Sequence, residues 1–536
     1  MIQVKIISSL EKVMPKTELD CNEISSLSGL SGETVSFQIA FCDKELKKYS
    51  FEISGAKTNN FFVENVPVEM PSLPNSYDDE NYISHNPGLY PDRLVPIDRN
   101  FVQAYKIYHS IWVSCKLPKG NHKITVRFFN DNADIVAEKS VGITVFENRL
   151  PKQKLIYTDW FYNDCIALYY GYEMFSDEHF VMIEKFLKMA YEYGVNMILT
   201  PVFTPPLDTD VGKKRPLTQL VKIEKSGKNY TFDFENLIRY IRLCKKVGFK
   251  YFEMPHLFTQ WGAKCTPRIS ATVNGRQTDI FGWDVPATSA KYKNFLSQFL
   301  PELISVLRAE KIDKNTYFHI SDEPNKVHTD NYKAACDIAK KHLRGFKIID
   351  ALSDIDFYKK GLIDIPVPST DHITPFLSEK LSERWCYYCC MQGKDVSNRF
   401  TAMPSARNRS IGIQMFKFKI NGFLHWGYNY YYSSRSRFKL NVYSCTDAYG
   451  AFPSGDSFVV YPGENGPLPT ISFMVFREAL NDLRALKLLE KQIGHEETVK
   501  FIEDILGKEI TFETCFTADK ILNMRKAVNE KISLNK

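Results

Sequence analysis

Two adjacent carboxylates, Asp322 and Glu323, follow the apolar segment Tyr317–Ile320 and precede a proline. A carboxylic acid can protonate a leaving group, and a second carboxylate can stabilise the positive charge that develops in a transition state. Neighbouring residues on a regular strand point to opposite faces, so both side chains reach one ligand only where the chain leaves strand geometry. A Glu-Pro step permits this. In the alternative interpretation, Asp322 caps the next helix and Glu323 is a polar loop residue.

The adjacency of this pair restricts the chemistry that it could perform. In the usual glycoside hydrolases the two carboxyl groups flank the scissile bond about 5 Å apart or further. Sequence neighbours do not easily reach such positions. They suit a substrate-assisted route, in which the sugar's 2-acetamido oxygen attacks the anomeric carbon. Asp322 would stabilise the acetamido nitrogen, and Glu323 would be the general acid and base, with a pKa raised by burial and by the neighbouring charge.

Aromatic and hydrogen-bonding side chains follow the other predicted strands, and most of the six tryptophans are among them. Flat amphipathic rings are surfaces on which sugars stack. His256 fits a structural role equally well, and Tyr387 and Tyr388 alternate in direction, so only one of them is expected to face a ligand. The expected substrate-binding residues are Asp159, Trp160, His256, Trp261, Asp371, Tyr387, Trp426, Tyr428 and Asn429.

Short apolar strands that alternate with helices must position these side chains. The predicted strands are 155–158, 197–200, 251–254, 317–320, 346–349, 366–369, 384–387 and 422–426, and helices with a 3.6-residue apolar period are predicted at 180–193, 234–247, 292–309 and 331–343. This alternation predicts an α/β fold with a (β/α)8 barrel, in which ligands bind at the C-terminal ends of the strands. A doubly wound open sheet is the alternative, but no glycine-rich phosphate loop follows the first strand.

The rest of the chain flanks this barrel. Residues 1–150 show period-two patterning broken by turns, which predicts an N-terminal antiparallel β-sandwich. Residues 151–490 would form the catalytic barrel together with a late helix at 471–491. Residues 491–536 read as a short C-terminal helical tail with helices at 496–506 and 518–532.

Composition narrows the possible partners. The 536 residues carry 69 basic and 63 acidic side chains, and a formal net charge of +6 indicates no dedicated nucleic-acid binder. No stretch of about 18 apolar residues or secretory leader occurs, so we expect no membrane insertion and a cytoplasmic location. Scattered cysteines favour a reducing compartment. Cys386, Cys389 and Cys390 lack the second half of a zinc site, so neither a metal nor a cofactor is expected. The oligomeric state stays open.

Three motifs in a fixed order carry a resemblance to a known family. Residues 317–324 read YFHISDEP, residues 422–429 read GFLHWGYN and residues 455–463 read GDSFVVYPG. Together they resemble glycoside hydrolase family 123 and its wider group of uncharacterised relatives. The resemblance covers roughly residues 150–490, and the N-terminal sandwich matches the family's layout.

This resemblance implies an exo-acting, retaining β-N-acetylgalactosaminidase that acts on an oligosaccharide or glycoconjugate, in the degradation of glycans or glycosphingolipids. By position, Asp322 becomes the acetamido stabiliser and Glu323 the acid/base, in agreement with the argument from adjacency. Ala479 and Leu483 depart from relatives, which commonly have Gly and Tyr there. Neither the configuration at the sugar's 4-hydroxyl nor the natural glycan follows from the sequence.

Two other functions remain open at this point. One is a barrel glycosidase for a sugar without an acetamido group, with Asp159 or Asp371 as nucleophile. The other is a catalytically inactive carbohydrate-binding protein that keeps the aromatic mouth.

Overall fold

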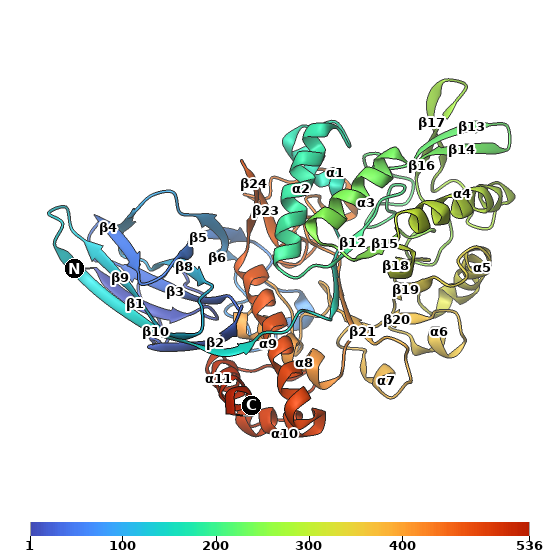
Figure 1. The fold of residues 1–536 in the computed structure, drawn as a ribbon. Coiled ribbons are helices and arrows are strands. Elements are labelled where there is room, and N and C mark those ends of the chain that lie inside the picture. Colours follow the sequence, from blue (N-terminus) through green and yellow to red (C-terminus); the bar gives the residue numbers. More distant parts are fainter. Residues whose placement is uncertain (1, 535–536) are drawn as a thin grey trace.

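The computed structural model describes residues 2–534, which form two N-terminal β-sheets, a central parallel sheet ringed by helices, and C-terminal helices packed where these parts meet (Figure 1). Among the described residues, no helix combines the length and the apolar character that crossing a membrane requires.

The N-terminal part contains two five-stranded sheets whose apolar faces share one core. In sheet order, the first consists of β1 (Gln3–Ser8), β3 (Val35–Cys42), β8 (His109–Cys115), β5 (Thr58–Val68) and β6 (Gly88–Pro96), and the second of β2 (Ser26–Ser31), β10 (Ile135–Arg149), β9 (Gly120–Phe129), β4 (Lys47–Ser54) and β7 (Phe101–Ala104). Buried Phe37, Ile111 and Phe128 belong to the shared core. The prediction of a purely antiparallel sandwich is wrong in one respect, because β2 and β10 run parallel.

Eight parallel strands form the central sheet, and each overlaps a strand predicted from the sequence. In sheet order they are β20 (Ile365–Val367), β19 (Lys347–Ala351), β18 (Thr316–Phe318), β15 (Tyr251–Glu253), β12 (Met197–Leu199), β11 (Ile156–Asp159), β22 (Gly422–His425) and β21 (Trp385–Tyr387). The predicted barrel is only nearly closed. Its two end strands, β20 and β21, meet through a single bridge between Ser369 and Tyr387 rather than through a regular ladder.

The helices around this sheet vary in length, and the shortest lie beside its open edge. Long helices follow most strands, but only single short turns of helix follow β19 and β20. The connecting helices are α1 (Asn163–Tyr170), α2 (Asp177–Glu192), α3 (Glu235–Val247), α4 (Ala290–Ala309), α5 (Thr329–Ala339), α6 (Ile355–Lys359), α7 (Thr374–Leu377) and α8 (Ser405–Lys417). Local signals fix their ends: Ser176 caps α2 by accepting from the His179 N–H, and Gly194 follows it with φ +105°.

Two small sheets were not predicted, because they lie within long loops. β14 (Asn229–Asp233), β13 (Lys222–Ser226), β16 (Ile269–Val273) and β17 (Arg276–Phe281) form a four-stranded sheet that projects from the barrel (Figure 1). β23 (Val460–Gly463) and β24 (Gly466–Pro469) form a hairpin.

Three C-terminal helices complete the chain: α9 (Ile471–Ile493), α10 (His495–Leu506) and α11 (Ala518–Leu534). α9 packs closely against α8, where the carbonyl of Ala479 would lie 2.1 Å from a Cβ placed on Gly412. α11 reaches the sandwich, because Arg525 pairs with Glu33 at the end of β2 and with Asp482 on α9. All three side chains are buried.

Candidate active site

A cavity of ≈ 170 Å³ opens at the C-terminal ends of the parallel strands. Loops from seven of the eight strands contribute to it, which is where a barrel positions its ligand site. Its lining consists of Trp160, Tyr162, Leu207, Asp208, Gln260, Trp261, Asp322, Glu323, Ala351, Tyr387, Cys389, Cys390, Leu424, Trp426 and Phe452. Of the residues expected from the sequence, it brings together Asp322, Glu323, Trp160, Trp261, Tyr387 and Trp426.

The backbone at Glu323 explains how two sequence neighbours reach one cavity. Glu323 has φ +43°, a left-handed conformation that is unusual for a residue with a side chain, and the chain turns sharply there. Hydrogen bonds hold the turn on both sides: the Trp261 N–H donates to the Asp322 carbonyl (2.9 Å) and the Glu323 N–H to the Ala351 carbonyl (3.1 Å). The departure from strand geometry that convergence requires is therefore present.

The environment of the pair favours retention of a proton. Burial, and then repulsion from Glu323, raise the pKa of Asp322 well above its usual value, while the His319 charge opposes this. Burial also raises the pKa of Glu323, which Asp456 reinforces and a hydrogen bond from the Tyr387 hydroxyl to Oε1 (3.0 Å) opposes. Glu323 is reached by solvent from the cavity although protein surrounds it. Such a pair can supply both an acid and a carboxylate.

A buried ionic triad lies beneath Asp322. His319 Nδ1 lies 3.2 Å from Asp350, and its Nε2 lies 3.0 Å from Glu253. Although burial disfavours its charge, these two carboxylates raise the pKa of His319 to about 9, so the imidazolium persists at neutral pH. Asp350 also accepts from the N–H groups of Ile320 (2.9 Å) and Ser321 (3.4 Å). The triad thereby fixes the backbone that carries Asp322.

The aromatic side chains of the cavity are held by specific contacts. Trp426 donates its indole N–H to Asp456 (3.0 Å), and its ring meets Tyr430 and Phe452 edge-on, each at 5.0 Å. Trp261 is 36% exposed at the rim. Trp160 packs edge-on against His256, and its indole N–H has no acceptor among the described residues. Rings held in this way can serve as platforms for a sugar.

Two expected binding residues lie below the cavity instead of lining it. Asp159 is buried and pairs with Arg399 Nη1 at 2.7 Å; burial alone would raise the pKa of Asp159, but the Arg399 charge holds it below its usual value. His256 is buried with its ring 4.3 Å from that of His319, and burial keeps its pKa well below the usual value.

Three more expected residues also lie outside the cavity lining. Asp371 lies beyond β20 and accepts from Ser369 Oγ (2.6 Å) and Gln392 Nε2 (3.2 Å). Tyr428 points outward, where its hydroxyl donates to the Phe186 carbonyl (2.9 Å). Asn429 is buried and joins both backbone groups of Tyr162. Their roles in the structure are to hold loops and helices in place. Of Tyr387 and Tyr388, Tyr387 faces the cavity, and Tyr388 packs against Phe423 and His425.

Sequence reasoning missed a third carboxylate in the cavity, Asp208. It accepts from the Tyr430 hydroxyl and the Arg435 N–H (2.7 Å), and burial raises its pKa. Asp208 lies nine residues beyond the end of β12. The sequence indicates site residues directly after predicted strands, so it does not point to Asp208. Phe452, far beyond the end of β22, was missed for the same reason, and Tyr162, three residues beyond β11, was also missed. A second cavity of ≈ 470 Å³ adjoins the first and is also lined by Glu323 and Tyr387.

The cysteine cluster and one histidine cluster were considered as metal ligands. Cys386 is buried in the core, whereas Cys389 and Cys390 line the cavity, so the three do not converge. The ligand atoms of His256, His319 and Asp350 all lie within 4.8 Å of one another. Both nitrogens of His319 already face carboxylates, Asp350 and Glu253.

The second and third sequence motifs pack on each other behind the cavity. A Cβ on Gly427 would lie 2.3 Å from the Asp456 carbonyl, so only glycine permits this approach. Asn429 and Phe458 form an antiparallel bridge. Asp456 thus holds Trp426 and contributes to the raised pKa of Glu323. Ala479 and Leu483, which depart from the motif pattern, lie on α9 outside the cavity lining.

Comparison with known proteins agrees with this arrangement. The model of the glycoside hydrolase 123 catalytic domain matches residues 160–489. The structure of a family 123 glycoside hydrolase from Clostridium perfringens, studied for glycolipid glycan hydrolysis, aligns with a TM-score of 0.76 at 16% identity, with 100% of each chain covered. No match is found among curated proteins.

Two further solved structures align more weakly. A glycosyl hydrolase family 2 member from Bacteroides cellulosilyticus aligns with a TM-score of 0.28 at 10% identity, over 79% of this chain and 47% of that chain. Parabacteroides merdae β-glucuronidase aligns with a TM-score of 0.33 at 10% identity, over 90% and 51%. The catalytic-domain match spans more than half of the sequence and includes both adjacent carboxylates, and on this ground the chain belongs to glycoside hydrolase family 123.

Proposed function

We propose that this glycoside hydrolase is an exo-acting, retaining enzyme that removes terminal β-linked N-acetylhexosamine, galacto-configured, from a glycan or glycolipid. The observation that carries the proposal is the turn at Glu323, which directs two adjacent carboxylates into one small aromatic cavity. The galacto configuration rests on the motif resemblance. The glycolipid class is supported by the C. perfringens structure, whose subject is glycolipid glycan hydrolysis.

In this proposal the acetamido oxygen of the substrate attacks the anomeric carbon while the glycosidic bond breaks. Glu323 gives its proton to the departing oxygen, and Asp322 accepts a hydrogen bond from the acetamido N–H as the oxazolinium ion forms. Glu323 then removes a proton from water, which opens the oxazolinium at the anomeric carbon with net retention. Glu323 lines both cavities, so one cavity could hold the sugar and the other the leaving group, with the acid between them.

Asp208 supports a second candidate function. It is a carboxylate in the same cavity, so it could act as nucleophile towards a sugar without an acetamido group. Its Oδ2 already accepts hydrogen bonds from the Tyr430 hydroxyl and from the Arg435 N–H, and both lower the nucleophilicity of the carboxylate. Asp159 and Asp371, the nucleophiles considered from sequence, do not line the cavity.

Hydrolysis of aryl β-glycosides by the full chain tests the proposal. We expect turnover of the N-acetylgalactosaminide, little turnover of the galactoside, and strong inhibition by the thiazoline analogue of the N-acetylated sugar. Asp322→Asn and Glu323→Gln should each lower kcat/KM by about 10²- to 10⁴-fold, the range for removal of a positioned acid or base. Asp371→Asn is the matched control, because Asp371 lies outside the cavity, and it should keep wild-type turnover.

Wild-type turnover in both cavity variants would overturn the assignment. Efficient cleavage of the galactoside that is insensitive to the thiazoline and lost in Asp208→Asn would establish the second candidate instead.

A further inference from the structure

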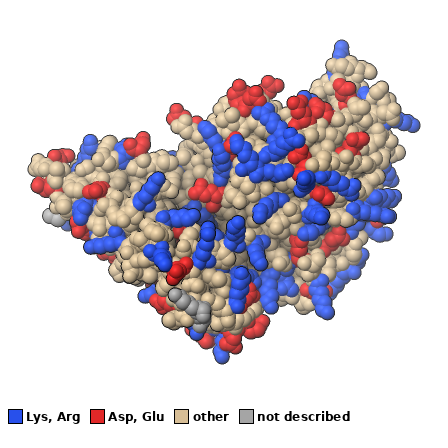
Figure 2. Space-filling model, viewed as in Figure 1, with Lys and Arg blue, Asp and Glu red and all other residues tan. Residues whose placement is uncertain are grey.

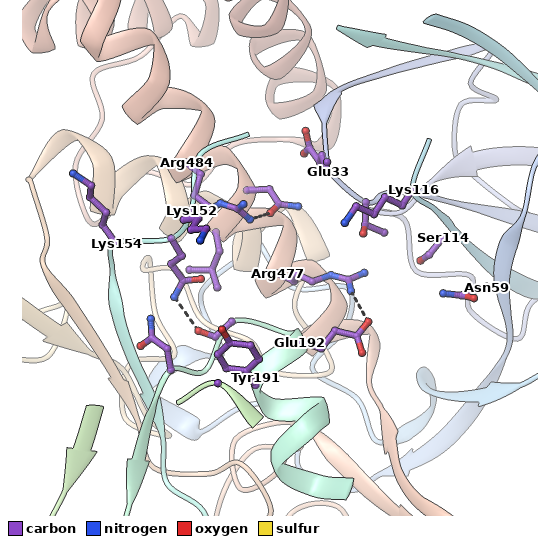
Figure 3. A pocket seen from close by; sticks show the side chains of 18 of the residues that line it. Glu33, Asn59, Ser114, Lys116, Lys152, Lys154, Tyr191, Glu192, Arg477 and Arg484 are labelled. Atoms are coloured by element: carbon purple, nitrogen blue, oxygen red, sulfur yellow. Dashed lines mark hydrogen bonds and ion pairs between the residues drawn. The ribbon is translucent and has the colours of Figure 1, made fainter. Parts of the chain in front are cut away.

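A wide, strongly charged cleft lies away from the catalytic cavity. It has a volume of ≈ 820 Å³ and is lined by residues of the sandwich, the segment before β11, the starts of β12 and β15, and α9 (Figure 3). Lys154, Asn196 and Lys250 each precede a barrel strand, so the cleft borders the N-terminal side of the barrel. The catalytic cavity lies at the opposite ends of the same strands.

The lining of this cleft is strongly basic, with seven basic and two acidic residues. Figure 2 shows Lys and Arg side chains gathered over the junction of sandwich and barrel on this face. Within residues 2–534, five lysines of the cleft form no ion pair: Lys57, Lys116, Lys152, Lys154 and Lys250. All five are exposed. Surface lysines usually have carboxylates interspersed among them, so this concentration of unpaired charge is available to a ligand.

The two acidic residues do little to neutralise the cleft. Glu33 is buried and already paired with Arg525. Glu192 is largely exposed and lies 3.9 Å from Arg477 Nη1, at the limit of an ion pair (Figure 3). Deeper in the cleft, Arg484 donates Nε to the Pro151 carbonyl (2.6 Å) and Nη1 to Asn481 (2.9 Å), both neutral acceptors. Among residues 2–534, no carboxylate forms an ion pair with its partly buried charge.

The remaining lining indicates a sugar rather than a bare polymer of phosphates. The lining also includes neutral hydrogen-bonding side chains, among them the exposed Asn59, which match a ligand with many hydroxyl groups. Ser114 and Asn196 border the cleft but already form hydrogen bonds within the protein. Tyr191 is 41% exposed and its ring is held against Gly248, where a Cβ would come within 2.5 Å. One fixed ring suits a sugar face, whereas single-stranded nucleic acids stack on several rings in series.

We propose that this basic cleft is a second carbohydrate site, which binds an anionic oligosaccharide bearing sulfate or carboxylate groups and holds it apart from the catalytic cavity. Its volume is within the range of ligand sites of about 300–1,000 Å³. The choice of a sugar rests on membership of a glycoside hydrolase family. The site does not depend on the chemistry of Asp322 and Glu323, and binding is measured without turnover, so failure of one proposal leaves the other intact.

Calorimetric titration of the full chain with a chondroitin sulfate hexasaccharide tests the proposal. The desulfated hexasaccharide retains only carboxylates and separates the two anion sources, and maltohexaose, which has no charge and no acetamido group, is the neutral control. Lys152→Glu/Lys154→Glu reverses two charges and should weaken binding about tenfold or more. Lys116→Glu, from the opposite wall, should also weaken it. Lys500→Glu/Lys508→Glu is the matched control, because both lysines are exposed on the C-terminal helical region outside the cleft.

The proposal predicts saturable binding of at least one anionic hexasaccharide, no binding of maltohexaose, and unchanged affinity in the control variant. The thiazoline should not displace the ligand, and aryl glycoside turnover should be unchanged in the cleft variants. Absence of binding, equal loss in the control variant, displacement by the thiazoline, or equal affinity for single-stranded DNA of the same charge would each overturn it.

Discussion

At the scale of single residues, the left-handed turn at Glu323 is the feature from which the site follows. A positive φ in such a residue costs of order 1–3 kcal/mol, and the surrounding hydrogen bonds must offset this cost. The Asp-Glu-Pro sequence indicated both the pair and the turn, because two neighbours could not otherwise share a ligand. The sequence did not indicate the role of His319, which lies three residues earlier, is buried, and places a positive charge beneath Asp322.

Removing the Tyr387 hydroxyl should change the pH dependence of hydrolysis. This hydroxyl donates to Glu323 and stabilises its ionised form, so Tyr387→Phe should raise the pKa of Glu323. A hydrogen bond to a charged group is stronger than one to a neutral group by about 1–1.5 kcal/mol, so the alkaline limb of kcat/KM should move up by roughly 0.7–1 pH unit. Tyr388→Phe is the control, because Tyr388 faces the core and should leave the limb in place. An alkaline limb that stays fixed or moves to lower pH in Tyr387→Phe would contradict the proposed acid.

Residues expected at the site but placed elsewhere share a physical reason. Strand ends can be predicted to within a residue or two, and in that interval the side-chain direction reverses. Asp159 and Tyr428 both stand within three residues of a strand end, yet one is buried against Arg399 and the other points to α2. Sequence can predict which loops meet, and the three-dimensional packing decides which of their side chains reach the cavity.

At the scale of elements, all eight barrel strands could be predicted, because each is a short apolar run followed by a turn. The open seam between β20 and β21 could not be predicted. β20 and β21 are the two end strands of the sheet, and whether they pair depends on how far the whole sheet curves. The helices next to this edge, α6 and α7, are single turns. The role of the third motif could not be predicted from its sequence. In the structure its Asp456 accepts a hydrogen bond from Trp426, the residue that follows β22.

Disrupting the contact between the second and third motifs should affect both stability and turnover. Gly427→Ala would place a Cβ 2.3 Å from the Asp456 carbonyl, so the two segments must separate. We expect a loss of about 1–3 kcal/mol in the free energy of unfolding, as for overpacking, and a lower kcat/KM because Trp426 and Asp456 move. Gly88→Ala, whose Cβ would lie 3.7 Å from Tyr90, is the control. Equal stability and activity of the two variants, measured by denaturation and by hydrolysis, would refute this role.

At the scale of the whole molecule, one buried ionic cluster joins the three parts of the chain. Arg525 on α11 pairs with Glu33 of the sandwich and Asp482 of α9, and Arg409 on α8 also pairs with Asp482. The helices of the C-terminal tail could be predicted from their period. Their role as a connection could not, because a charged residue on a predicted helix is ordinarily expected to face solvent.

Breaking this cluster should destabilise the protein without changing its chemistry. Arg525→Met leaves Glu33 without its buried partner, and the loss should be about 3–5 kcal/mol. We expect a lower thermal midpoint in calorimetry and unchanged kcat/KM well below that midpoint, because no member of the cluster lines the catalytic cavity. Lys520→Met, at an exposed position of the same helix, should unfold like the wild type. A midpoint of Arg525→Met equal to that of the control would show that the connection contributes nothing.

The central claim is that the substrate's own acetamido oxygen is the nucleophile, held by Asp322 while Glu323 delivers the proton. Its most direct test is the rate of hydrolysis of aryl β-N-acylgalactosaminides whose acyl group carries none, one, two or three fluorine atoms. Each fluorine withdraws electrons from the acyl oxygen. The account predicts that kcat falls steeply along this series, and a kcat that is independent of fluorination would contradict it.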